Sequence, residues 1–68
     1  MLNMIDWFAH VRIKETGITG IVVDIHTVNG IERFEVESDE KGTPGGFGDD
    51  DSWKLYGCVE SELEVIEE

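Results

Sequence analysis

The feature that most constrains the fold is the dipeptide Asn29-Gly30, which separates two runs of strand-forming residues, Ile21–Thr27 and Ile31–Glu37. A two-residue type I′ turn needs a positive φ angle at both central residues, and Asn-Gly adopts such angles readily. The two runs are therefore predicted to pair as an antiparallel β-hairpin.

The residues of this hairpin also indicate which faces are buried. Ile21–Thr27 begins with three consecutive apolar residues, which is typical of a strand buried on both faces, so it is expected to be the central strand. In the following run Phe34 and Val36 alternate with charged residues, and they are expected to point into the core.

Further strands are expected on both sides of the hairpin. One begins at about Phe8, after a short irregular or helical lead-in, and directs Val11 and Ile13 inward. The others are Trp53–Cys58 and Leu63–Ile66.

The segment that joins these last two strands is predicted to turn. Within Trp53–Cys58, Trp53 and Leu55 alternate with Lys54 and Tyr56. A short helical turn is expected before the last strand, because Ser61 and Glu64 have the spacing of a capping box.

Five short strands with a short helical turn before the last one predict an all-β fold, a small five-stranded barrel whose curled sheet has short edges. At 68 residues the chain has room for one domain, residues 1–68. Residues 38–52 are acidic and rich in glycine, and they are expected to form a long flexible loop within it. Because most connections in compact domains are shorter, this loop is either functional or a flexible hinge tip.

Two segments resemble a known family. VRIKETGITGIVVDI, residues 11–25, resembles the start of SH3-like barrels of the KOW type, and WKLYGCVESELEVI, residues 53–66, resembles their end. Together they cover most of the chain, which is similar to small SH3-like proteins of Gram-positive bacteria and their phages. The resemblance implies an SH3-like barrel. The chain departs from the pattern at residues 7–10, where such barrels often have a Gly-Asp turn.

The charge of the chain bears on its partners. There are sixteen Asp and Glu residues but only five Lys and Arg, which gives a net charge of -11. RNA-binding members of the KOW group carry basic loops, and non-specific affinity for nucleic acid comes from Lys and Arg. The composition therefore argues against direct binding of DNA or RNA. Thirteen of the sixteen acidic residues lie from Glu32 onward. They are interpreted either as a solvated surface or as an imitation of nucleic acid that occupies a basic groove of a nucleic-acid-handling protein.

Residue types that often bind metals do not form a recognisable pattern. The loop carries Asp49, Asp50 and Asp51 near Asp39 and Glu40, but it lacks the alternating ligands and final glutamate of an EF-hand. We expect no metal and no cofactor.

The same holds for catalytic residues. The spacing of His10, His26 and Cys58 matches no zinc pattern, and so small a barrel rarely forms a catalytic pocket around a cysteine. We therefore expect a protein that is not an enzyme.

The aromatic residues give the remaining indication of function. SH3-like barrels bind extended peptides in an aromatic groove. Phe47, Trp53 and Tyr56, with the neighbouring residues Asp49, Asp50 and Asp51, are predicted to bind a partner, whereas Phe8 and Phe34 are assigned to the core. Packing in the core is the alternative for Phe47 and Trp53. The sequence thus predicts an acidic protein-interaction module that binds a protein partner. A basic surface on that partner would complement the charge of the module.

The single Cys58 cannot form an internal disulfide, and the chain shows neither a secretory signal nor a long apolar span. We expect a cytoplasmic protein in which Cys58 is reduced and buried and which does not contact membranes.

Overall fold

The computed structural model describes residues 5–66, which form one antiparallel sheet of five strands. The strands are β1 (His10–Ile13), β2 (Thr19–Val28), β3 (Ile31–Lys41), β4 (Trp53–Val59) and β5 (Leu63–Val65), and a single turn of 3-10 helix, η1 (Glu60–Glu62), precedes β5. The predicted all-β fold class, with five strands and a short helical turn before the last, is confirmed. The expected lead-in at residues 1–4 lies outside the described residues.

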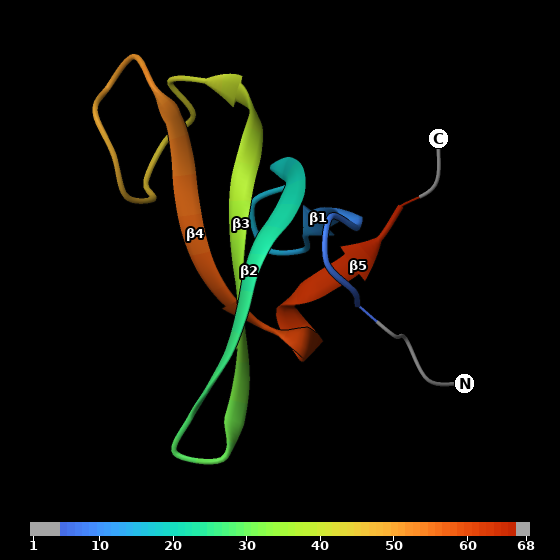
Figure 1. Ribbon diagram of the computed structural model, residues 1–68. Coiled ribbons are helices and arrows are strands. Elements are labelled where there is room, and N and C mark those ends of the chain that lie inside the picture. The colour runs from blue at the N-terminus through green and yellow to red at the C-terminus, as the bar shows by residue number, and fades with distance from the viewer. Residues whose placement is uncertain (1–4, 67–68) are drawn as a thin grey trace.

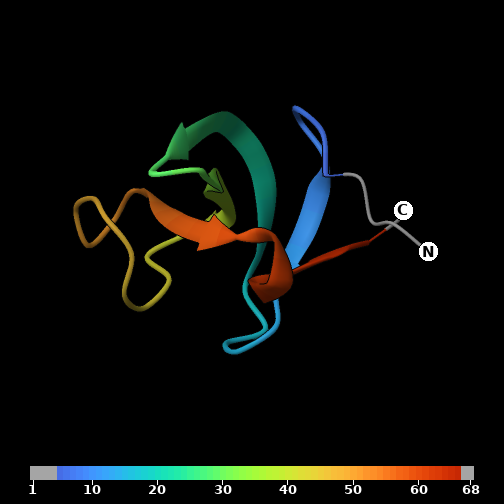
Figure 2. The same ribbon diagram turned by 90° about the horizontal axis from the view of Figure 1, so that it is seen from below.

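The sheet has the order β4-β3-β2-β1-β5, so β2 is the central strand, as predicted. Its first residues pair with both β1 and β3, whereas the rest of it pairs with β3 alone. Val22 lies opposite Val36 and Asp24 lies opposite Glu35, which leaves Val23 as an extra residue. Such a β-bulge bends a strand and increases its twist. Accordingly the sheet curls, and β5 runs across the direction of β3 and β4 (Figures 1 and 2).

The Asn29-Gly30 turn has the predicted conformation. The φ angles are 52° at Asn29 and 79° at Gly30, and Val28 pairs directly with Ile31 across the turn. The end of this hairpin projects away from the rest of the sheet (Figure 1). Val28 and Ile31 are exposed there, so the conformation of the turn rests on its own two residues.

Every strand contributes to the core of the protein. Its buried apolar residues are Val11, Ile13, Val22, Phe34, Val36, Cys58 and Leu63. The predicted inward positions in β1 and β3 and the predicted burial of Phe34 and Cys58 are therefore confirmed.

The first strand begins later than predicted, at His10 rather than at Phe8. Phe8 has a φ angle of 65°, a left-handed conformation that cannot continue a strand, and its backbone N–H donates a hydrogen bond to the carbonyl oxygen of Val22 at 2.8 Å. Its side chain is 71% exposed, so the assignment of Phe8 to the core is wrong.

The predicted loop 38–52 is also too long, because Ser38–Lys41 continue β3. The side chain of Ser38 is buried, donates a hydrogen bond to the carbonyl oxygen of Glu40 and accepts one from the backbone N–H of Lys54. These bonds hold a polar segment in strand conformation. The connection between β3 and β4 therefore consists of residues 42–52, called the β3–β4 loop below.

In β4 the core-facing positions are occupied by Lys54, Tyr56 and Cys58. Residues directly opposite each other in a sheet share a face, and Tyr56 and Cys58 lie opposite two core residues of β3. Lys54 is only 7% exposed, whereas Trp53 is 51% exposed.

The expected capping box of Ser61 and Glu64 does not form. The carboxylate of Glu62 accepts a hydrogen bond from the backbone N–H of Val59 at 2.9 Å, and Glu64 forms an ion pair with Arg12 instead.

Candidate functional site

A groove with a volume of about 360 Å³ lies beside β4, at the edge of the sheet. It brings together the β1–β2 loop, the β3–β4 loop, β4 and η1, which are distant in sequence. The residues that line it are Ile13, Glu15, Thr16, Gly46, Phe47, Leu55, Tyr56, Gly57, Cys58 and Glu62. The floor is therefore mainly apolar, and carboxylates lie on the side of the β1–β2 loop and η1.

Side chains of β4 position the β3–β4 loop. The hydroxyl of Tyr56 donates a hydrogen bond to the carbonyl oxygen of Pro44 at 2.6 Å and lies 2.7 Å from the hydroxyl oxygen of Thr43. The ammonium group of Lys54 donates to the carbonyl oxygens of Thr43 at 3.3 Å and Gly45 at 3.0 Å. A buried cation needs such partners, since leaving it unpaired would cost several kcal/mol. The two side chains thus hold the β3–β4 loop against β4.

The loop presents Phe47 at the groove. The backbone N–H of Phe47 donates to the carbonyl oxygen of Leu55 at 2.7 Å, and the N–H of Leu55 donates to the carbonyl oxygen of Phe47 at 2.9 Å. This antiparallel bridge fixes the backbone of Phe47, yet its side chain is 79% exposed. An exposed aromatic ring is therefore held on an ordered backbone.

The structure divides the predicted partner-binding residues into two groups. Phe47 and Tyr56 line the groove together, whereas Trp53 does not. Trp53 packs beneath the ammonium group of Lys41, which lies 4.4 Å from the ring centroid. Asp49, Asp50 and Asp51 are exposed residues of the β3–β4 loop shortly before β4, and they do not line the groove.

Among the groove residues, sequence reasoning selected Phe47 and Tyr56 alone, and it missed, for example, Glu15, Glu62 and Gly57. Glu15 lies in the β1–β2 loop and Glu62 in η1, and no local pattern indicates that the fold brings them together. Gly57 did carry a signal, because glycine within a strand often marks the close approach of another backbone or a ligand.

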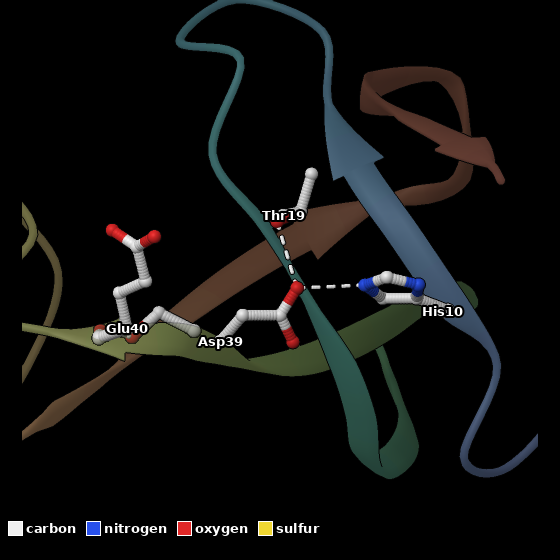
Figure 3. Close-up of polar contacts among 5 residues, drawn as sticks. His10, Thr19, Asp39 and Glu40 are labelled. Carbon is white, nitrogen blue, oxygen red and sulfur yellow. Dashed lines mark hydrogen bonds and ion pairs between the residues drawn. The ribbon is translucent and has the colours of Figure 1, made fainter. Parts of the chain in front are cut away.

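A polar cluster outside the groove joins β1, β2 and β3. One carboxylate oxygen of Asp39 lies 2.7 Å from Nε2 of His10 and accepts a hydrogen bond from the hydroxyl of Thr19 at 2.7 Å (Figure 3). Because Thr19 donates to the carboxylate and not to the imidazole, the cluster does not activate a hydroxyl nucleophile. It instead ties β3 to β1 and β2.

The hydrogen bonds of this cluster change the acidity of Asp39. Partial burial acts to raise its pKa and is the largest single influence. The hydrogen bonds from His10 and Thr19 and the charge of His10 together outweigh burial, so that the pKa of Asp39 lies below the ordinary value of 3.8.

The structure also describes the surroundings of Cys58 and the arrangement of possible metal ligands. Burial, with a smaller contribution from the charge of Glu62, raises the pKa of the Cys58 thiol to about 11, so it is not a thiolate nucleophile at neutral pH. Among residues 5–66 no group of three His, Cys, Asp or Glu side chains is arranged to hold a metal ion. Within the same residues no helix is long and apolar enough to cross a lipid bilayer.

Comparison of the chain with protein-family models, with curated proteins and with solved structures found no match.

Proposed function

We propose that this chain is a non-enzymatic, acidic protein-interaction module that binds an extended segment of a protein partner in the groove beside β4. The observation that carries the proposal is Phe47, whose ring is 79% exposed although two backbone hydrogen bonds fix its main chain. A rigid exposed aromatic loses little conformational entropy on binding, and such residues anchor many protein interfaces.

The charges at the groove support a basic partner. Glu15 and Glu62 line it, and the whole chain carries a net charge of -11. In residues 5–66, Arg12 with Glu64 is the one ion pair within 4.0 Å between a Lys or Arg and a carboxylate. Lys54 is directed to backbone carbonyl oxygens. Most carboxylates are thus available to attract a cationic partner.

We also propose that the chain is related to the SH3-like barrels of the KOW type and acts in the cytoplasm. The strand order and the 3-10 turn between β4 and β5 support the first proposal. The buried free thiol of Cys58 supports the second, because single unpaired cysteines are common in reducing compartments.

Selection from a displayed library of random peptides, with the intact protein as bait, tests the main proposal. We expect enrichment of peptides that combine an apolar residue with Lys or Arg. Phe47→Ala should abolish the enrichment. Trp7→Ala is the matched control, since Trp7 is also an exposed aromatic but lies outside the groove. Failure to enrich any peptide, or equal enrichment by the Phe47 variant, would contradict the proposal.

The second candidate function is a nucleic-acid-mimicking inhibitor of a nucleic-acid-handling protein, and the excess of carboxylates without ion pairs among residues 5–66 favours it. The two functions differ in salt dependence, because a mimic binds through many charges and loses affinity steeply as salt rises. Replacing Asp49, Asp50 and Asp51 by Asn should weaken a mimic more than Phe47→Ala does. If the partner binds in the groove, Phe47→Ala should instead weaken binding more than the replacement of the three aspartates does.

A further inference from the structure

We infer that the bound segment adds to the sheet as a β-strand at the free edge of β4, with its backbone bonded to Gly57. This inference deepens the proposed function and rests on it. Its ligand is an extended segment of a basic partner protein, in which an apolar residue is flanked by Lys or Arg.

The backbone groups of Gly57 point to the free edge of β4. Along a strand, successive residues direct their N–H and C=O groups to opposite edges. Leu55 directs both groups away from β3, toward Phe47. Gly57, two residues further along β4, therefore directs its N–H and C=O to the same edge. Among residues 5–66 no strand pairs with that edge, where the bridge of Phe47 to Leu55 stands alone.

The fold does not require a glycine at position 57. Gly20 is needed, because a Cβ atom there would collide with the carbonyl oxygen of Glu37. At Gly57 the φ angle is not positive, and a Cβ atom would lie 3.7 Å from Nη2 of Arg33 and 3.8 Å from Oε2 of Glu35, which are ordinary contacts. Glycine within a strand is destabilising relative to alanine, so its presence at an exposed edge points to the close approach of another chain.

The side chains around this edge indicate the chemistry of the added strand. Phe47 already forms a short antiparallel bridge on this edge, and its ring, with Leu55 and Tyr56, offers apolar contacts to a segment that continues the same line. Glu15 and Glu62 lie within reach of flanking cations in the same groove. A second copy of this chain is a poor occupant, because two molecules with a net charge of -11 would repel each other.

Amide exchange in the complex with a selected peptide tests the strand addition. We expect the amide proton of Gly57, which is free to exchange in the uncomplexed protein, to become protected when the peptide binds. Peptide binding that leaves this amide unprotected would overturn strand addition while leaving the interaction function intact. Failure of any peptide to bind would overturn both. Protection of Gly57 that rises with protein concentration without peptide would overturn the inference in favour of self-association.

Removing the donor is the sharper test. The Gly57-Cys58 junction allows ligation of a synthetic thioester of residues 1–57 to a peptide of residues 58–68, so that Gly57 can be replaced by N-methylglycine. Its methyl group removes the N–H and occupies the position of the added strand. We expect peptide affinity to fall about tenfold or more. The matched control is the same replacement at Gly30, in the turn between β2 and β3. Equal affinity for the two N-methylated proteins would overturn the inference.

The variant Gly57→Ala tests the argument from glycine. We expect the melting temperature (Tm) of this variant to equal or exceed that of the wild type. A lower Tm would show that the fold itself requires the glycine and would overturn that argument.

Discussion

The two connections on either side of β3 are held in their conformations by different interactions. Asn29-Gly30 joins β2 to β3 by a two-residue turn. Residues 42–52 join β3 to β4 by a longer loop that folds back and bonds to β4. The turn relies on the φ preferences of its two residues. The β3–β4 loop relies on Lys54 and Tyr56, which lie beyond its end. A turn that needs no tertiary contact can project into solvent, while a loop with anchors can present Phe47 at a fixed place.

The largest expected effect separates these two kinds of connection by one substitution in each. Gly46 and Gly30 both have positive φ angles, 71° and 79°. An alanine at either position is strained by about 1–2 kcal/mol. At Gly46 the added Cβ would also lie 2.7 Å from Cζ of Tyr56, where overpacking costs about 1–3 kcal/mol more. We expect Gly46→Ala to lower the free energy of unfolding by about 2–5 kcal/mol and Gly30→Ala by about 1–2 kcal/mol, measured by urea denaturation.

Gly45→Ala is the control within the loop itself. Gly45 has the same φ angle of 71° as Gly46, but its Cβ would lie at an ordinary 3.9 Å from the ring of Tyr56. Gly45→Ala should therefore lower the free energy of unfolding by about as much as Gly30→Ala does. Equal losses at Gly45 and Gly46 would show that the loop does not pack tightly on Tyr56.

This contrast also explains how much of the fold could be predicted from the sequence. The Asn29-Gly30 turn and the inward positions of β1 and β3 follow from local preference and alternation. The residue at which β3 ends and the residues of β4 that face the core do not follow from local preference and alternation. Ser38–Lys41 looks like a loop because it is polar, and Lys54 looks solvent-facing because it is charged. Each is placed by hydrogen bonds to residues far away in sequence. Likewise, the conformation of Phe8 depends on its bond to Val22.

The candidate site was predictable in the same uneven way. Phe47 and Tyr56 could be selected as aromatic residues near a long loop. Composition could not show that Trp53, the most conspicuous aromatic residue after that loop, lies outside the groove. Nor could it place Glu15 beside Glu62, because that proximity arises only when the sheet curls.

The next largest effect is expected when the cationic anchor of the β3–β4 loop is removed. Lys54→Met keeps an apolar stem of similar length but leaves the carbonyl oxygens of Thr43 and Gly45 without their donor. Hydrogen bonds to charged groups contribute about 1.5–3 kcal/mol, and a comparable loss of stability is expected. Lys14→Met is the control, because this substitution removes the same charge from an exposed side chain. Thermal unfolding measures both; an equal shift in Tm would mean that charge alone matters.

A smaller effect is expected for the second anchor. Tyr56→Phe removes only the hydroxyl that bonds Pro44 and Thr43. We expect a loss of about 0.5–1.5 kcal/mol, the range for a neutral hydrogen bond. The amide of Phe47 should exchange faster in this variant, while amides beside Asn29-Gly30 should exchange at the wild-type rate. Uniform acceleration at both places would show that the loop and the hairpin are not independent.

The smallest effect is a dependence on pH at the end of β3 where the β3–β4 loop begins. The pKa of Asp39 is lowered in the folded protein, because hydrogen bonds from His10 and Thr19 outweigh its partial burial. A carboxyl group with a depressed pKa stabilises the folded state when it is ionised. Its contribution is therefore present above the ordinary value of 3.8 and is lost as the pH falls through the lower folded value. The wild type should be more stable than Asp39→Asn at neutral pH, and the difference in Tm should shrink as the pH falls below about 4. The amide of Gly42, which donates to the carbonyl oxygen of Ser52 at the base of the loop, should lose protection over the same range. A difference between the two proteins that stays constant down to low pH would mean that the ionised carboxylate is not what ties β3 to β1 and β2.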